Sequence, residues 1–488
     1  MSTPTVGAGS GSIPRHGLLP PWGVTDLPAP PPFTVRNVFR TIGPGVIGLG
    51  IAIGSGEWLL GPAIVARYGP TVLWVTTVSV LLQVFLNIEM ARYTMYTGEP
   101  IITGYMRTWP GPGFWSWVYG VLTFLQIGWP GWALASATAS AAILLARVPG
   151  AADAGLVKLV GYVTFGICVL ILTVGRKIER NLEFAMWILM TAVFGYLLMI
   201  DLTMVSAESW SAILKGFVSF GALPSGGDWL LLGGFAAYSG LGGMSNAFIT
   251  NWMRDKGFGM GATVGYIPSA TGAHVPLSAH GNVFAVDARS RERWNSWFRY
   301  LNVDQWLIFA IGSVAGMMLT TLMSLEFIPH GTQVSGWAVA DLQASNIAVR
   351  HGAIFWYLTL MTGFWVLFKT QLGNSDGLVR SVTDMLWSGS IAARGWCRGD
   401  VRKIYYTVMT VFIVWGCIAL NLAQPLTLVV IGANVAGLNF VFVSLHTIVV
   451  NRKFLPVELR PPIWREILVA FGAVFFGGFV LVLIASRL

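Results

Sequence analysis

The stretch Gly43–Glu57, GPGVIGLGIAIGSGE, decides the fold of this chain. It begins as an apolar membrane segment, is interrupted by Gly54-Ser55-Gly56 where it should cross the middle of a bilayer, and ends in the carboxylate of Glu57. In hydrocarbon every backbone N–H and C=O needs a partner, so interrupted backbone survives only where it is buried in protein or lines a cavity. Broken helices of this kind are typical of secondary transporters.

The composition is that of a membrane protein. The chain has 488 residues, of which 55 % are hydrophobic and 10 % charged. Soluble domains average about 25 % charged residues. Apolar runs of about 20 residues, the length that spans a bilayer, recur from Thr41 onward, so residues 41–488 are predicted to be one transmembrane domain. Residues 1–40 are rich in Pro and Gly and lack the apolar core of a secretory signal, which predicts a disordered cytoplasmic tail.

Hydropathy, with Gly, Pro and charge clusters as punctuation, predicts about eleven transmembrane helices and an all-α integral membrane protein. The predicted spans lie near residues 42–66, 70–92, 115–145, 156–175, 182–204, 228–250, 304–325, 352–387, 404–423, 426–450 and 465–486.

The orientation follows from the basic residues. Most of the 30 Lys and Arg residues fall in alternate loops that share one side if the N-terminus is inside, which is the pattern of the positive-inside rule. We therefore expect a multi-pass protein in the plasma (inner) membrane of a prokaryote, with a cytoplasmic N-terminus and a cytoplasmic insert at 251–303. The basic charge then faces anionic lipid, and no nucleic-acid partner is needed to explain it.

A second interruption lies in the sixth span. The segment Tyr238–Asn246, YSGLGGMSN, places glycines where a helix should be regular. The two interruptions are five spans apart, and corresponding breaks in two five-helix halves indicate an inverted repeat with the binding site between them.

The segment Gly43–Trp74, GPGVIGLGIAIGSGEWLLGPAIVARYGPTVLW, resembles the first helix of the Nramp family of divalent-metal transporters. The resemblance implies a LeuT-like 5+5 inverted repeat with broken helices 1 and 6, and extends along the chain to Asn451–Lys453. It places the family's DPGN metal-binding motif on Gly54-Ser55-Gly56-Glu57 and its MPH motif on Met244-Ser245-Asn246.

This chain departs from the family at both motifs and in helix 3. Gly54 stands where the family has its metal-binding Asp, and Glu57 where it has Asn. Phe114–Leu145 contains no Asp or Glu, whereas proton-coupled members have acidic residues there. The chain is therefore expected to be a divergent, Nramp-like branch without the family's usual proton coupling.

The candidate binding residues each have a structural alternative. Glu57 could contact substrate, since buried acidic residues in spans mark functional paths, or it could satisfy exposed N–H groups. Met244 could supply a thioether to a transition metal or only fill space, and Asn246 offers an amide oxygen and two N–H donors. The predicted substrate site comprises Gly54, Ser55, Glu57, Tyr238, Gly243, Met244 and Asn246, with Glu57, Met244 and Asn246 as metal ligands.

Three further residues are candidates for gating or coupling: Lys369, Asp376 and Asn439. Lys369 could act as a fixed cation in place of a coupling ion, or pair with Glu57 or Asp376. The interpretation we prefer from sequence is a lysine at the inner helix end that snorkels to headgroups. Asp376 is spaced i,i+4 from Arg380, as in simple helix-surface ion pairs. For Asn439 the structural alternative is a hydrogen bond that holds two helices together.

Two functions compete. The first, and the one we predict, is alternating-access transport of a divalent cation such as Mn²⁺ or Mg²⁺, which the resemblance favours. The second is transport of a small organic cation or zwitterion, which the lost Asp, Lys369 and the 22 tryptophans favour through cation–π contact. We expect a monomer without cofactor, whose partners are the transported cation and the lipid bilayer. An enzyme is not expected, since the chain has no HExxH and its one GxSxG match, Gly373–Gly377, lies within a predicted span and not at a strand-to-helix turn.

Overall fold

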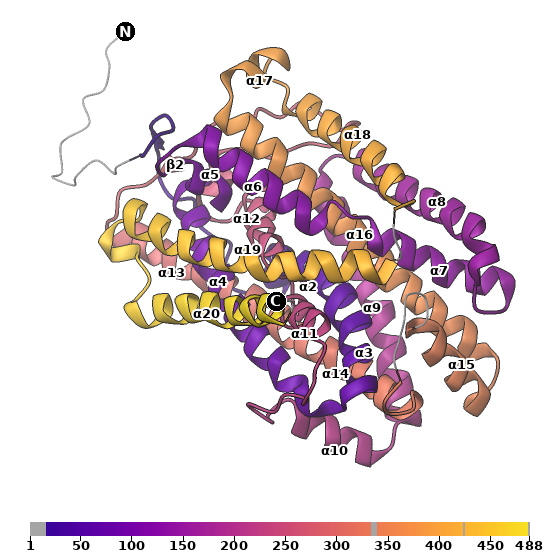
Figure 1. The fold of residues 1–488 in the computed structure, drawn as a ribbon. Coiled ribbons are helices and arrows are strands. Elements are labelled where there is room, and N and C mark those ends of the chain that lie inside the picture. The colour runs from indigo at the N-terminus through magenta and orange to yellow at the C-terminus, as the bar shows by residue number, and fades with distance from the viewer. Residues whose placement is uncertain (1–15, 333–338, 423–424, 487–488) are drawn as a thin grey trace, which may run out of the picture.

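The structure is a computed structural model that describes residues 16–332, 339–422 and 425–486. It is built almost entirely of helices (Figure 1). The elements up to residue 216 are β1 (Gly23–Val24), α1 (Val35–Thr41), α2 (Pro44–Ser55), η1 (Gly56–Leu60), α3 (Gly61–Tyr68), η2 (Pro70–Leu73), α4 (Trp74–Thr97), α5 (Ile101–Met106), α6 (Pro112–Ile127), α7 (Gly131–Leu145), η3 (Ala151–Asp153), α8 (Ala154–Thr173), α9 (Ile178–Met204) and α10 (Ala207–Gly216).

The remaining elements carry the second predicted break and the C-terminal helices. They are α11 (Trp229–Tyr238), α12 (Met244–Lys256), η4 (Gly259–Thr263), β2 (Asn282–Val283), α13 (Ala288–Asn302), η5 (Val303–Ala310), α14 (Ile311–Phe327), α15 (Val339–His351), α16 (Ile354–Gly389), α17 (Ile391–Trp396), α18 (Val401–Ala419), α19 (Pro425–Phe454), η6 (Val457–Leu459) and α20 (Ile463–Ala485).

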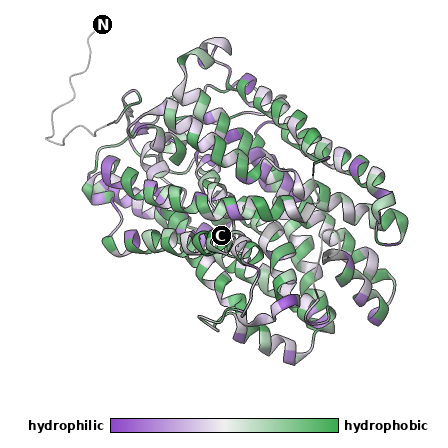
Figure 2. Cartoon of the chain, viewed as in Figure 1, coloured by the Kyte–Doolittle hydropathy of each residue, from purple (hydrophilic) through white to green (hydrophobic). Residues whose placement is uncertain are grey.

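The prediction of an all-α membrane fold is confirmed. Among the described residues, 8 helices are long and apolar enough to cross a membrane, and apolar residues run along most of the long helices (Figure 2). The broken pairs α6/α7 and α11/α12 consist of pieces of 10 to 16 residues, each shorter than the roughly 20 residues that a span needs. The count of eleven and the inverted repeat stay predictions.

The first span is the centre of the bundle. Its most apolar window, within Pro44–Tyr68, is 100 % buried inside the protein, whereas that of Ile463–Ala485 is only 22 % buried. Peripheral helices expose large apolar side chains such as Leu159, Val411 and Leu481, as expected where lipid replaces water. The interrupted helix therefore contacts protein on every side, which is the condition for broken backbone in a membrane.

Two predicted spans differ in the structure. The third is not continuous: α6 ends at Ile127 and α7 begins at Gly131, because Pro130 has no N–H to continue the ladder. The seventh starts earlier than predicted, since α13, η5 and α14 form one helical run of 40 residues from Ala288 to Phe327. Its first turns are amphipathic and rich in arginine, so the sequence pattern places them in the insert, which in the structure spans only residues 257–287.

The N-terminal segment also departs from the prediction, because residues 16–34 pack against the bundle. β1 pairs in parallel with β2 of the insert, and Trp22 and Leu27 are buried. Arg107 donates to the carbonyl of Pro20 at 2.9 Å, and Trp297 donates to that of Pro28 at 2.9 Å. A proline-rich segment has few backbone N–H donors to bond its own carbonyls. Here side chains of the bundle donate to those carbonyls.

The residue that anchors this segment is itself held by a buried carboxylate. Arg107 Nη2 lies 2.5 Å from Glu99 Oε1. Burial alone would raise the pKa of Glu99, but the adjacent Arg107 guanidinium outweighs it and holds the pKa below its usual range. The ion pair therefore fixes the arginine that binds the N-terminal segment.

Candidate functional site

The interruption in the first span is a kink followed by a wide turn. Ile53 has φ −72° and ψ 63°, and this non-helical ψ kinks the first span near the end of α2. The chain then forms the π-helical turn Gly56–Leu60 before α3. Isolated π-helical turns inside α-helices often occur at functional sites. The break predicted at residues 54–56 is thus present, and Glu57 lies inside the π-helical turn.

The sixth span is broken outright. α11 ends at Tyr238 and α12 begins at Met244, and between them Gly240, Gly242 and Gly243 have φ values of 109°, 78° and 48°. Residues with a Cβ rarely adopt such values, so the glycines are what allows the turn. This confirms the break predicted from YSGLGGMSN.

Two glutamines satisfy the backbone of the helix-6 break. Gln83 of α4 accepts from the N–H of Leu241 at 2.8 Å and of Gly242 at 3.0 Å, and donates to the carbonyl of Ser239 at 2.8 Å. Gln126 of α6 accepts from the N–H of Met244 at 3.0 Å and donates to the carbonyl of Gly242 at 2.9 Å. Neither glutamine is among the site residues predicted from the sequence, although a glutamine within an apolar span indicates that some polar group nearby needs a hydrogen-bond partner.

Glu57 joins the two breaks. It is 0 % exposed, and its Oε1 accepts from the N–H of Gly240 at 3.2 Å. Among the described residues its Oε2 has no hydrogen-bond partner. One carboxylate oxygen of Glu57 therefore satisfies a backbone N–H group, which is the structural alternative given in the sequence analysis. The other oxygen is available to accept a hydrogen bond from a ligand.

Lys369 lies at the kink of the first span, not at a membrane surface. Its side chain is 0 % exposed, and Nζ donates to the carbonyls of Gly50 at 2.5 Å and Ile53 at 2.7 Å. The prediction that it snorkels to headgroups is wrong, because α16 continues for 20 residues beyond it, to Gly389. Its ammonium interacts electrostatically with Glu57, which agrees with the alternative that Lys369 pairs with Glu57. A role as a fixed cation in place of a coupling ion stays a prediction.

Two asparagines beside the breaks each keep a free oxygen. Asn246 donates through Nδ2 to Asn87 Oδ1 at 2.9 Å and to Gln83 Oε1 at 3.3 Å. Asn439 donates through Nδ2 to Gln126 Oε1 at 2.8 Å. Both Oδ1 atoms are buried without a hydrogen-bond partner among the described residues.

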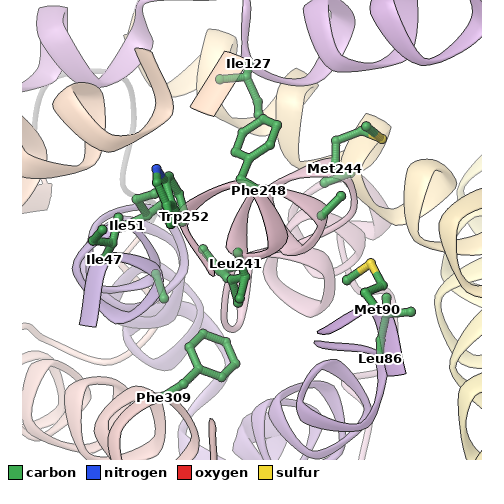
Figure 3. Packing of buried hydrophobic residues seen from close by; sticks show 14 of the residues in the cluster. Ile47, Ile51, Leu86, Met90, Ile127, Leu241, Met244, Phe248, Trp252 and Phe309 are labelled. Carbon is green, nitrogen blue, oxygen red and sulfur yellow. The ribbon is translucent and has the colours of Figure 1, made fainter. Parts of the chain in front are cut away.

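The other predicted site residues take structural positions at the breaks. Tyr238 is the last residue of α11, and its ring is tilted by 47° against that of Trp132, with ring centroids 6.1 Å apart. Gly54 packs on Thr370, and Gly243 on the carbonyl of Ala436. The Met244 side chain lies in the apolar core with Met90 and Phe248 (Figure 3), which is its space-filling alternative. The side chain of Ser55 lies outside the described residues.

Asp376 belongs to a separate ion cluster two turns along α16. It accepts two bonds from Arg380, at 2.9 and 3.0 Å, and Arg380 also pairs with Asp255 of α12. All three side chains are fully buried. The i,i+4 pair predicted from the sequence is present, but it is an internal link between α12 and α16 and not a helix-surface pair.

The breaks must approach each other closely, which gives a test. A Cβ on Gly56 would lie 1.9 Å from the carbonyl oxygen of Tyr238. Gly56→Ala is therefore expected to lower the free energy of unfolding by about 1–3 kcal/mol, the usual range for overpacking. Thermal unfolding in detergent would measure it. Gly166→Ala in α8 is the control, because nothing lies within 4 Å of its added methyl group, and an equal loss in both variants would contradict the close contact.

Two broken helices thus meet at the centre of an apolar bundle with a buried acid between them, which is the arrangement that the sequence predicts for a binding site between two breaks. Among the described residues no group of three or more His, Cys, Asp or Glu side chains is placed to hold a metal ion.

Comparisons with known proteins agree on the fold. No protein-family model and no curated protein matches the chain. A variant of the manganese transporter of Eremococcus coleocola superimposes with a TM-score of 0.61 at 14 % identity, covering 96 % of this chain and 90 % of that one. The same transporter in complex with an aromatic bis-isothiourea substituted compound gives 0.59 at 13 % identity, covering 98 % and 91 %. The predicted Nramp-like architecture is thereby confirmed at the level of the fold.

Proposed function

We propose that the protein is a secondary transporter that moves a small organic ammonium compound, a monocation or a zwitterion, by alternating access at the two breaks. One observation carries the proposal. Among the described candidate residues for binding, gating or coupling, the buried side-chain atoms left without a partner are all acceptor oxygens: Glu57 Oε2, Asn246 Oδ1 and Asn439 Oδ1. Buried polar atoms nearly always have a hydrogen-bond partner. These oxygens therefore favour a cargo that supplies N–H donors or positive charge.

The assignment of the free oxygens is forced by their neighbours. Gln83 Oε1 accepts from two backbone N–H groups, so the Asn246 atom that faces it must be the amide nitrogen. Gln126 Oε1 accepts from the N–H of Met244, which in the same way turns the nitrogen of Asn439 toward it. In both cases the oxygen is left for the cargo.

The charge of the site favours an organic ammonium group over a bare dication. The single carboxylate, Glu57, is already faced by the ammonium of Lys369, which also occupies two carbonyls of the helix-1 kink. A dication would meet this fixed positive charge at low dielectric, where like charges repel strongly. The buried rings of Tyr238 and Trp132 at the helix-6 break suit the face of an alkylammonium group.

A partly hydrated divalent cation is the second candidate. It is supported by the oxygen-only acceptor set, which suits hard cations such as Mg²⁺ that keep several waters, and by the fold shared with a manganese transporter. It requires that water in the site screens the dication from Lys369.

The test is the thermal stability of purified protein against ethanolamine, choline and glycine betaine on one side and Mn²⁺, Mg²⁺ and Ca²⁺ on the other. A ligand at 100 times its Kd adds about 2.7 kcal/mol to the folded state. We expect a rise in Tm with at least one ammonium compound that is lost in Glu57→Gln. Glu208→Gln, on the exposed face of α10, should keep it. A rise with metals alone would select the second candidate, and no rise with any compound would overturn the site.

A further inference from the structure

We propose that Lys369 is a built-in cation that occupies a cation site at the kink of the first span, so that transport needs no inorganic coupling ion there. The inference rests on the proposed function only in taking the protein as a transporter. It concerns the occupant of the kink, not the identity of the cargo.

The oxygens around the ammonium form the frame of a cation site. Nζ lies 2.5 Å from the carbonyl oxygen of Gly50 and 2.7 Å from that of Ile53. These carbonyls belong to the end of a helical segment, where the dipole is negative and oxygens lack helical partners. Freed carbonyls at the ends of broken helices are where transporters of this kind coordinate cations.

Thr370 sets the position of the ammonium relative to these carbonyls. Its Oγ1 lies 3.2 Å from the carbonyl oxygen of Ile51. A Cβ on Gly54 would lie only 1.8 Å from the same Oγ1, so α16 and α2 are in direct contact at this point. These contacts between α16 and α2 fix the position of Lys369, so its ammonium is held at the carbonyls of the kink.

The charge balance explains why the lysine is tolerated. A buried ammonium is costly unless it is paired and hydrogen-bonded. Here two carbonyls accept from it, and Glu57 supplies the opposite charge at the same break. A lysine ammonium is a compact point charge with three donors, which is the closest that a side chain comes to a small monovalent cation.

Removing the ammonium should therefore leave an empty site that external cations can fill. The experiment measures Tm of wild type, Lys369→Ala and Lys369→Met in the chlorides of Na⁺ and K⁺, against bulky N-methylglucamine at equal ionic strength. We expect the Tm of wild type to be independent of the cation. We expect Lys369→Ala to have a lower Tm in N-methylglucamine and to regain part of it with Na⁺ or K⁺, increasingly with concentration. Lys369→Met, which fills the space without charge, should regain less.

Two results would overturn the inference: stabilisation of wild type by Na⁺ or K⁺, or a folded Lys369→Ala protein that responds to none of the cations. If Lys369→Ala does not fold, uptake of the ammonium compound by wild-type proteoliposomes decides, with N-methylglucamine as the sole salt cation and no pH gradient. Uptake to equilibrium supports a built-in cation, and uptake that requires Na⁺ or K⁺ rejects it. The Na⁺ and K⁺ series contains no small ammonium compound, so failure of the proposed cargo leaves this result unaffected.

Discussion

Arg380→Met is expected to lower the free energy of unfolding by about 3–5 kcal/mol, the usual effect of removing one partner from a buried ion pair. Arg380 is fully buried and pairs with Asp376 and with Asp255. Without it, Asp255 keeps Arg254 at 2.7 Å, but Asp376 keeps only the neutral donors Trp252 and Tyr405, both at 2.7 Å. The uncompensated charge on Asp376 is what destabilises the fold.

Thermal unfolding in detergent, together with the yield of folded protein, would measure this loss. Arg380→Met combined with Asp376→Asn should recover part of the stability, because the asparagine removes the charge and keeps an acceptor. The matched control is Arg147→Met, since the Arg147 side chain is 56 % exposed in its pair with Asp153 and such surface pairs contribute about 0–1 kcal/mol. If both single variants lost the same stability, the cluster between α12 and α16 would not be the internal link described above.

The sequence predicts what depends on local pattern. Glycines in an apolar run locate both breaks, and a carboxylate at the first one identifies Glu57, because neither feature belongs in an ordinary span. The likeness of Gly43–Trp74 to Nramp transporters gives the architecture that the solved structures then share. These predictions need no knowledge of which helices are neighbours.

What the sequence does not predict depends on depth and on partners far along the chain. Lys369 follows the last residue of an apolar run, so its depth cannot be read without knowing that α16 continues to Gly389. Residues 16–34 have the composition of a disordered tail, yet donors on Arg107 and Trp297, far away in sequence, order them.

The same limit hides the residues that hold the helix-6 break. Gln83 meets Leu241 across 158 positions, and Gln126 meets Met244 across 118. A glutamine in a span gives no indication of which backbone it will satisfy, whereas the broken backbone does indicate that some such partner must exist.

Gln83→Leu tests that requirement most directly. Leucine has a similar size and cannot bond, so the N–H groups of Leu241 and Gly242 and the carbonyl of Ser239 lose their partner together. Each buried group left unsatisfied costs about 1–3 kcal/mol, and no bulk water is available in a bilayer to replace the glutamine. We expect the largest loss of thermal stability among the neutral substitutions discussed here. We also expect loss of the ammonium-dependent rise in Tm, because Asn246 is oriented through the same Gln83 oxygen.

Two further variants separate the backbone effect from a general loss of packing. Gln83→Glu, protonated at this buried position, keeps an acceptor for the two N–H groups and an O–H that can donate to the carbonyl of Ser239, so it should retain more stability than Gln83→Leu. Gln371→Leu removes a buried glutamine of α16 that accepts from a single backbone N–H, that of Ala133 at 3.2 Å, and should cost correspondingly less. If Gln371→Leu were as harmful as Gln83→Leu, the number of unsatisfied backbone groups would not set the cost. The helix-6 break would then be held by packing of its glycines against α4 and α19, and the free oxygen of Asn246 would keep its orientation without Gln83.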